Sequence, residues 1–216
     1  MSTRVVAEHK DREARMRYVE SSVRSPQIVA AARRVMMRDS VARTTIRAVA
    51  TEAGIPLGTL QHVFPTKELL LKAVIDDVAS ESNAHTGSLV RHAGLAETIR
   101  EGARSYWHGL IDDNVPYQVM QVELLNYALR STGDDFSERW PFSAQAAAVV
   151  SLLEATASNA GEVTGAPFER IARLFIAGLD GLMLQYAADL DSRRAEEDLE
   201  ALIDATILYA RIRPSH

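Results

Sequence analysis

The chain has 216 residues, enough for one large or two small domains, and its 47% hydrophobic and 25% charged residues are typical of a soluble globular protein. It holds no cysteine, which excludes disulfides, thiolate metal sites and a cysteine nucleophile. No apolar run approaches the roughly 18 residues of a membrane span, and the polar N-terminus lacks a signal-peptide core. We therefore expect a cytoplasmic protein with no membrane partner.

The net charge of −5 conceals two parts of opposite sign. Residues 1–72 hold 13 Lys and Arg against 7 Asp and Glu, whereas residues 73–216 hold 11 against 22. A basic part joined to an acidic remainder indicates that the first part faces a polyanion. On charge alone, chance segregation of surface charge is the alternative.

Three helices are predicted after a charged arm at residues 1–24. Ser25 and Pro26 suit an N-cap followed by proline at the first helical position, and this helix should end near residues 38–40. A second, short helix follows a cap at Thr44 or Thr45 and ends at Gly54. A third covers about residues 56–63, before Pro65 breaks the chain and a longer helix begins.

Helical periodicity continues through the rest of the chain, with turn signals between the segments and no convincing strand alternation. The predicted fold class is all-α. The predicted domains are the arm (1–24), a DNA-binding domain (25–72) and a larger helical domain (73–216). Helices in the larger domain are expected at about residues 95–112, 116–131, 143–161, 167–188 and 195–212.

Residues 44–67, TTIRAVATEAGIPLGTLQHVFPTK, carry the most informative pattern. Two short amphipathic helices meet at Gly54, as in a helix-turn-helix. Ala50 and Ala53 are small enough to let the helices cross closely. The second helix has few large charged groups, so its surface can enter a major groove. The candidate DNA-binding residues are Thr45, Arg47, Leu57, Gly58, Thr59, Gln61, His62 and Lys67.

Each of these residue types has a role available on DNA. Thr45 lies at a helix N-terminus, which attracts phosphate, and Lys67 is a candidate phosphate clamp. Gln61 can pair with adenine through two hydrogen bonds, and His62 can meet a base or a phosphate. Gly58 lets the backbone approach DNA closely, while Arg47, Leu57 and Thr59 can reach base edges, a phosphate or a thymine methyl.

Residues 25–78 resemble the TetR family of transcription regulators, over about a quarter of the chain. The matching motifs are Ala31-Ala32, TTIRAVA at 44–50, AGI at 53–55, GTLQ at 58–61, Phe64 and KELL at 67–70. Two positions depart from the family pattern. Gln61 stands where the family usually has an aromatic residue, so the operator sequence cannot be transferred from relatives. Ser40 stands where it usually has glycine, which affects the turn after the first helix.

The resemblance implies a homodimer that binds double-stranded DNA and answers to a small-molecule effector. In that family, two long helices from each chain form a four-helix bundle, here residues 143–161 and 167–188. A single chain core is the alternative for these faces. The family's middle helices enclose the effector, and an apolar surface with a few polar groups suits a pocket. The predicted ligand-binding residues are Trp107, Met120, Glu123, Asn126, Tyr127 and Met183. Ordinary core packing is an equal alternative for each one.

Two other classes of function are possible alternatives for this sequence. An enzyme is disfavoured because the chain lacks a Gly-x-Ser-x-Gly, a phosphate-binding glycine loop and a His-Glu-x-x-His, and no catalytic residue, cofactor or metal is expected. The second alternative is a helical interaction or ligand-binding protein without specific DNA binding. The presence of Thr45, Arg47 and Lys67 favours the regulator.

Overall fold

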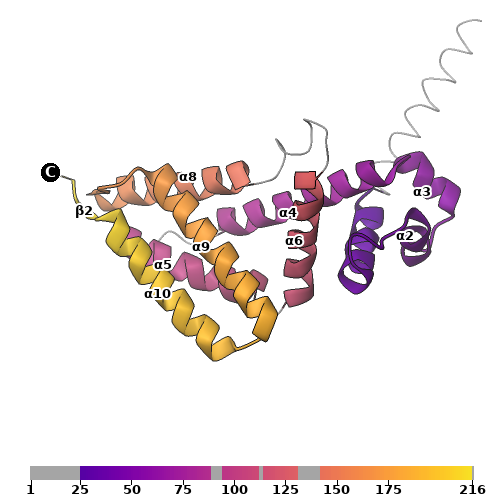
Figure 1. The fold of residues 1–216 in the computed structure, drawn as a ribbon. Coiled ribbons are helices and arrows are strands. Elements are labelled where there is room, and N and C mark those ends of the chain that lie inside the picture. Colours follow the sequence, from indigo (N-terminus) through magenta and orange to yellow (C-terminus); the bar gives the residue numbers. More distant parts are fainter. Residues whose placement is uncertain (1–24, 89–93, 112–113, 131–141, 216) are drawn as a thin grey trace, which may run out of the picture. The chain divides into compact units, whose positions relative to one another are not determined.

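The computed structural model describes residues 25–88, 94–111, 114–130 and 142–215, and the predicted arm at residues 1–24 lies outside them. The chain divides into two compact units between Val74 and Ile75. Helices make up most of the described chain, which confirms the all-α prediction (Figure 1).

The described part of the first unit is a small helical domain around one core. Its helices are residues 25–39, α2 (Ile46–Ala53), α3 (Leu57–Val63) and the start of α4 (Lys67–Ser88). Ile28, Val35, Val49 and Leu60 are completely buried. Because these apolar side chains recur at helical spacing, each helix presents one face to a shared core.

Thr45 and Gly54 set the ends of α2, as their residue types predict. The Thr45 hydroxyl accepts a hydrogen bond from the Ala48 amide at 3.1 Å, which is the N-cap geometry. Gly54 has a φ of +67°, in the left-handed region where a glycine carries no steric penalty. The Ile55 amide then bonds the Ala50 carbonyl at 3.1 Å, so the chain reverses within two residues and α3 begins at Leu57.

Ser40 stands where the family pattern usually has glycine, and it also has a left-handed backbone, with a φ of +78°. The Ser40 amide bonds the Met36 carbonyl at 2.9 Å. The Ser40 carbonyl accepts the Thr44 hydroxyl at 2.8 Å and the Thr44 amide at 3.1 Å. The turn therefore places at residue 40 a conformation that favours glycine, which explains the glycine of the family pattern.

The second unit is a bundle of longer helices. In chain order these are the remainder of α4, α5 (Leu95–Tyr106), a π-helical turn (Trp107–Ile111), α6 (Val115–Arg130), α8 (Phe142–Ala160), α9 (Phe168–Asp189) and α10 (Ser192–Ala210). Within this unit α9 packs against both α8 and α10, and α5 contacts α8 and α10 (Figure 1). Helix α9 is therefore central to the unit.

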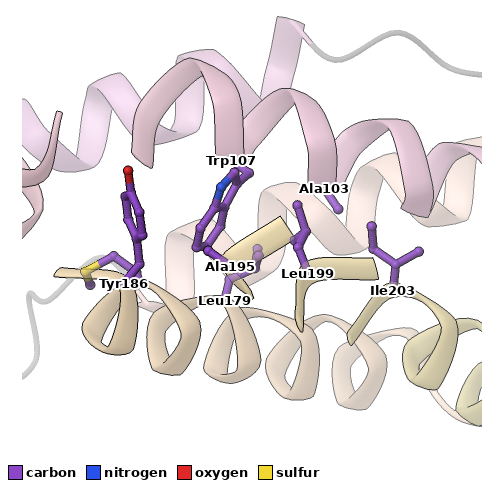
Figure 2. Close-up of a cluster of buried hydrophobic side chains, with 8 residues drawn as sticks. Ala103, Trp107, Leu179, Tyr186, Ala195, Leu199 and Ile203 are labelled. Carbon is purple, nitrogen blue, oxygen red and sulfur yellow. The ribbon is translucent and has the colours of Figure 1, made fainter. Parts of the chain in front are cut away.

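One core cluster joins α5 and its π turn, α9 and α10. Figure 2 shows Trp107 beside Tyr186, with ring centroids 5.8 Å apart at 54°, above Leu179 and next to Leu199. Trp107 is 1% exposed and Leu199 is completely buried. Burying an aromatic side chain of this size is among the larger single contributions to a core, so this cluster fixes how the three helices pack.

The unit also contains a short pair of β-strands and a helix cap from a residue distant in the sequence. Neither was predicted from the sequence. Strands β1 (Glu162–Val163) and β2 (Arg213–Pro214) pair antiparallel, with Glu162 opposite Pro214. The Glu162 carboxylate also accepts the Leu95 amide at 2.7 Å, where Gly94 offers no capping side chain. A negative group at this helix N-terminus satisfies a backbone donor that would otherwise lack a partner.

Among the described helices, α9 alone is long and apolar enough to cross a membrane by length and composition. Arg173 and Asp180 interrupt its apolar residues, so the sequence holds no uninterrupted apolar run of that length. Such a helix is weak evidence for a membrane span, since the core helix of a soluble protein passes the same test. Its Ile171, Ala172 and Ile176 are buried inside the unit.

We predict that Ser40→Gly raises the free energy of unfolding by about 0.5–1 kcal/mol. Glycine removes the strain of a left-handed L residue, and its greater freedom in the unfolded chain offsets part of that gain. Urea unfolding of the two proteins measures the difference. Ser40→Val should destabilise the chain, and a glycine variant less stable than the wild type would contradict the proposed strain.

Candidate functional site

Helix α3 presents most of the predicted base-reading residues at the surface. Gly58, Gln61 and His62 are exposed, and Leu57 and Thr59 are partly exposed. A Cβ placed on Gly58 would meet no atom within 4 Å, so its missing side chain leaves open surface. The outward side of α3 therefore combines hydrogen-bonding groups with a position where another molecule can approach the backbone.

The N-terminus of α2 supplies a second group of exposed donors. The Thr45 and Arg47 side chains are exposed, and Thr45 caps the helix through Ala48. The first amides of a helix have no acceptor within the helix and carry a partial positive charge, which suits a phosphate. The Arg47 guanidinium adds a full positive charge on the same turn.

Lys67 has a structural role that the sequence did not predict. Its ammonium group donates to the Val41 carbonyl at 3.0 Å and the Ala42 carbonyl at 3.2 Å, tying the start of α4 to the turn after the first helix. Partial burial lowers the pKa of Lys67. Because an ammonium group carries three donors, one remains for a phosphate.

Two exposed arginines of the first helix bind an acidic residue of α2. The Arg34 Nε lies 2.7 Å from a Glu52 oxygen, and the Arg38 Nη1 lies 3.1 Å from the other. Their hydrogen bonds, that of Arg34 first, lower the pKa of Glu52. These contacts are solvent-exposed and each contributes little stability. They nevertheless keep the two guanidinium groups next to the Glu52 carboxylate.

The six predicted ligand-binding residues fall in different environments. Trp107 and Met183 belong to the buried cluster of Figure 2, and Met120 is 1% exposed. Asn126 is exposed and donates to the Val122 carbonyl at 3.2 Å, while Glu123 and Tyr127 are partly exposed. They do not line the apolar cavity described next, and their role in ligand binding stays a prediction.

An apolar cavity of about 50 Å³ lies within the second unit, enclosed by α4, α5, α8, α9 and α10. Tyr106 and Gln145 are among its few polar lining residues, and the Gln145 amide donates to the Tyr106 hydroxyl at 3.1 Å. The His85 ring meets the Tyr106 ring edge-on, with centroids 5.6 Å apart. Apolar walls with a few placed polar groups are typical of ligand sites.

A groove of about 290 Å³ is lined by Asp180 together with Ala146, Arg173, Ile176 and Ala177. Ile176 also lines the cavity. Asp180 has no hydrogen bond or ion pair with any described residue, and burial alone raises the pKa of its carboxyl group to about 6. Burial raises the pKa of Tyr106, and the Asp180 charge raises it further, so the two side chains interact electrostatically.

Both Tyr106 and Asp180 have recognisable signals in the sequence. Tyr106 follows Ile99 and Ala103 at helical spacing, and Asp180 is the single charged residue in LFIAGLDGLML at 174–184. In the described part of the chain, no three His, Asp or Glu side chains come together as metal ligands.

Two short helices joined at Gly54, with an outward-facing second helix in a basic unit, define a helix-turn-helix DNA-binding protein. Residues 28–74 match the family model described as bacterial regulatory proteins, tetR family. Over 186 residues the chain is 27% identical to the HTH-type nicotine-responsive transcriptional repressor HdnoR of Paenarthrobacter nicotinovorans, covering 84% of this chain and 93% of that protein. Residues 28–74 therefore carry a TetR-type DNA-binding domain, and most of the chain is similar to a transcriptional repressor.

Solved structures of similar fold cover both units. A transcriptional regulator from Rhodococcus sp. Rha1 has a TM-score of 0.71 at 20% identity, covering 88% of this chain and 99% of that one. Salmonella enterica GusR has a TM-score of 0.69 at 18% identity, covering 86% and 94%. At these identities the likeness shows the fold, and this fold is shared with those regulators over nearly the whole chain.

We predict that Asp180→Asn raises the free energy of unfolding at pH 7.5 by up to about 3 kcal/mol. Folding raises the pKa of the Asp180 carboxyl group by about two pH units, and each unit corresponds to about 1.4 kcal/mol. Above pH 6 the folded chain holds a poorly solvated charge that the unfolded chain exposes to water. As the pH falls from 6 to below 4, the folded state takes up its proton first, and the gain should disappear. Urea unfolding at several pH values measures it.

Among the described residues, the charged or titratable groups linked to Asp180 are Arg173, which lines the same groove, and Tyr106, whose pKa its charge raises. Glu169→Gln, at an exposed position on the same helix, is the matched control and should show no such pH-dependent gain. An Asp180→Asn gain that is independent of pH, or no gain at all, would contradict the burial of an uncompensated carboxylate.

Proposed function

We propose that this regulator is a cytoplasmic, ligand-responsive repressor that binds a near-palindromic operator as a homodimer. The observation that carries the proposal is the outward face of α3, where Gly58, Gln61 and His62 are exposed while Leu60 anchors the helix in the core. This arrangement supports insertion of α3 into the major groove. The relative HdnoR, named as a nicotine-responsive repressor, supports the assignment of repression and ligand response.

Dimerisation is needed because one helix-turn-helix makes too few base contacts to select a site in a genome. Helix α9 carries an exposed stripe at alternating spacings of three and four residues. Its members are Leu174, Ala177, Leu184 and Ala188, with the partly exposed Gly181 between them. Leu174 is 51% exposed and Leu184 is 50% exposed, which is unusual for a central helix. A Cβ on Gly181 would meet nothing within 4 Å, so this side is open.

Helix α8 carries a matching stripe of small and polar residues at the same spacing: Ala144, Ala147, Ser151, Glu154 and Ser158. A repeat of this kind suits close packing of two helix pairs in a bundle. We therefore assign the dimer interface to these two stripes, an apolar one from α9 and a small-residue one from α8.

Other residues of these two helices do not fit the proposed interface. Leu153, Ala157 and Ile171 are buried in the core of their own chain. A Cβ on Gly178 would overlap the Leu202 side chain, so Gly178 permits close contact with α10 inside the chain. Ala147, Leu174 and Gly181 remain outward candidates.

The effector site proposed here is the apolar cavity and the adjoining groove. The cavity holds about 50 Å³ and is small for a ligand site, so a bound ligand would stabilise a wider arrangement of the surrounding helices. A ligand that prefers a different spacing of the two DNA-binding units lowers DNA affinity, and DNA lowers the affinity for that ligand by the same factor. The rival function is a helical ligand-binding or interaction protein without specific DNA binding.

Selection of genomic DNA fragments by the full chain should recover one near-palindromic sequence. Gln61→Ala should reduce its preference over random DNA about tenfold or more, because one bidentate base contact contributes about 1–3 kcal/mol of discrimination. Arg47→Ala should weaken binding to all sequences, and the slope of log K against log salt should fall by about one. Competition binding at two salt concentrations measures both effects.

Arg193→Ala, at an exposed arginine of α10 that pairs with Glu197, is the matched control and should change neither quantity. The rival function would be favoured if the wild-type chain bound every DNA fragment weakly and without sequence preference. In that case a higher salt concentration would reduce binding to all fragments equally.

A lysine placed in the exposed α9 stripe should dissociate the dimer, because a charge cannot be buried between two apolar surfaces without a partner. Leu174→Lys and Leu184→Lys should each give a monomer in sedimentation equilibrium at micromolar concentration. Leu208→Lys, at a 79% exposed leucine of α10, is the control and should stay dimeric. A dimer lost equally in all three variants would place the interface elsewhere.

A further inference from the structure

Asp180 occupies an unusual position for a charged residue. It lies on α9 between the buried Leu179 and the open Gly181, in a segment that is otherwise apolar from residue 174 to residue 184. Exposed acidic residues are available to keep the protein soluble, so solubility does not explain a carboxylate here. Its place at the wall of the groove makes it a candidate for contact with a bound molecule.

Among the described residues, this carboxylate has no ion-pair partner. None of them donates a hydrogen bond to Asp180 either, although Arg173 lines the same groove. A desolvated carboxylate without a partner is costly, and its pKa of about 6 leaves it ionised at neutral pH. The cost would be offset by a molecule that brings a positive charge into the groove.

The surroundings of Asp180 suit the rest of such a molecule. Ile176 lines both the groove and the cavity, and Tyr106, whose pKa the Asp180 charge raises, lines the cavity with Phe175. The face of an aromatic ring attracts a cation, and the apolar walls favour a hydrocarbon body. An anionic molecule would be repelled by Asp180, and a neutral one would leave its charge uncompensated.

We propose that the cavity and groove bind a small organic cation, an amine with an apolar body, whose charged group lies against the Asp180 carboxylate beside Tyr106. This inference rests on the proposed function, since it names the chemical class of the effector. Ala177 belongs both to the groove and to the exposed α9 stripe. A bound amine would therefore alter the surface that we assign to the dimer, which couples the ligand to DNA binding.

The test compares two probes of nearly equal shape, benzylamine, which is cationic at pH 7.5, and benzyl alcohol, which is neutral. Each is titrated into the full chain without DNA, and binding is followed by the methyl NMR signals of labelled isoleucines. Ile176 should shift, whereas Ile28 and Ile46 in the first unit serve as internal references. We expect benzylamine to bind at least tenfold more tightly than the alcohol.

Asp180→Asn should abolish this preference and leave the affinity for benzyl alcohol unchanged. Glu169→Gln removes a negative charge from an exposed position of the same helix and is the matched control, so its preference should equal that of the wild type. If the variant at residue 180 does not fold, the wild-type comparison of the two probes still decides the question.

Equal affinity for the two probes, no binding of either, or a preference that survives Asp180→Asn would each overturn the proposal. Because the titration contains no DNA, its failure leaves a selected operator and its salt dependence intact. Conversely, if the chain selects no operator but prefers the amine, the amine site would be supported and the proposed repressor function would be contradicted.

Discussion

The left-handed backbone of Gly54 is the constraint on which the DNA-binding unit depends. It ends α2 within one residue, and the bond from the Ile55 amide to the Ala50 carbonyl closes the reversal. Any residue with a Cβ would be strained there. The reversal brings Val49 and Leu60 into one core, so the opposite side of α3 is exposed with its glutamine and histidine outward. The surface proposed to read DNA thus follows from one backbone conformation.

Helix α4 gives the ligand region a covalent route to that surface. Its first residue, Lys67, is tied through its ammonium group to the carbonyls of Val41 and Ala42, and Thr86 near its other end lines the cavity. One continuous helix therefore begins in the first unit and ends in the second. A change of the cavity walls that shifts or rotates α4 would also move the turn that follows the first helix. Coupling between two sites requires an element of this kind, with two alternative positions.

Local sequence signals were enough to predict the fold class and the helix-turn-helix, because Thr45 and Gly54 act on their own neighbours. Contacts between distant residues were not predictable in this way. The Glu162 carboxylate caps α5 although it lies 67 residues further along the chain, and no local sequence pattern predicts this hydrogen bond. The cavity shows the same limit: Trp107 was predicted to bind the ligand, with core packing as the alternative, and it lies in the core while its neighbour Tyr106 lines the cavity. A π-helical turn begins at Trp107, so the face assigned to residues near it cannot be deduced from regular spacing.

The central claim is that two α3 helices occupy successive major grooves of one DNA site. Hydroxyl-radical footprinting of the full chain on its selected fragment tests this most directly. We predict two protected half-sites on one side of the duplex, with centres about one helical turn apart, about 34–36 Å. A single protected half-site, or weak protection spread evenly along the fragment, would contradict it.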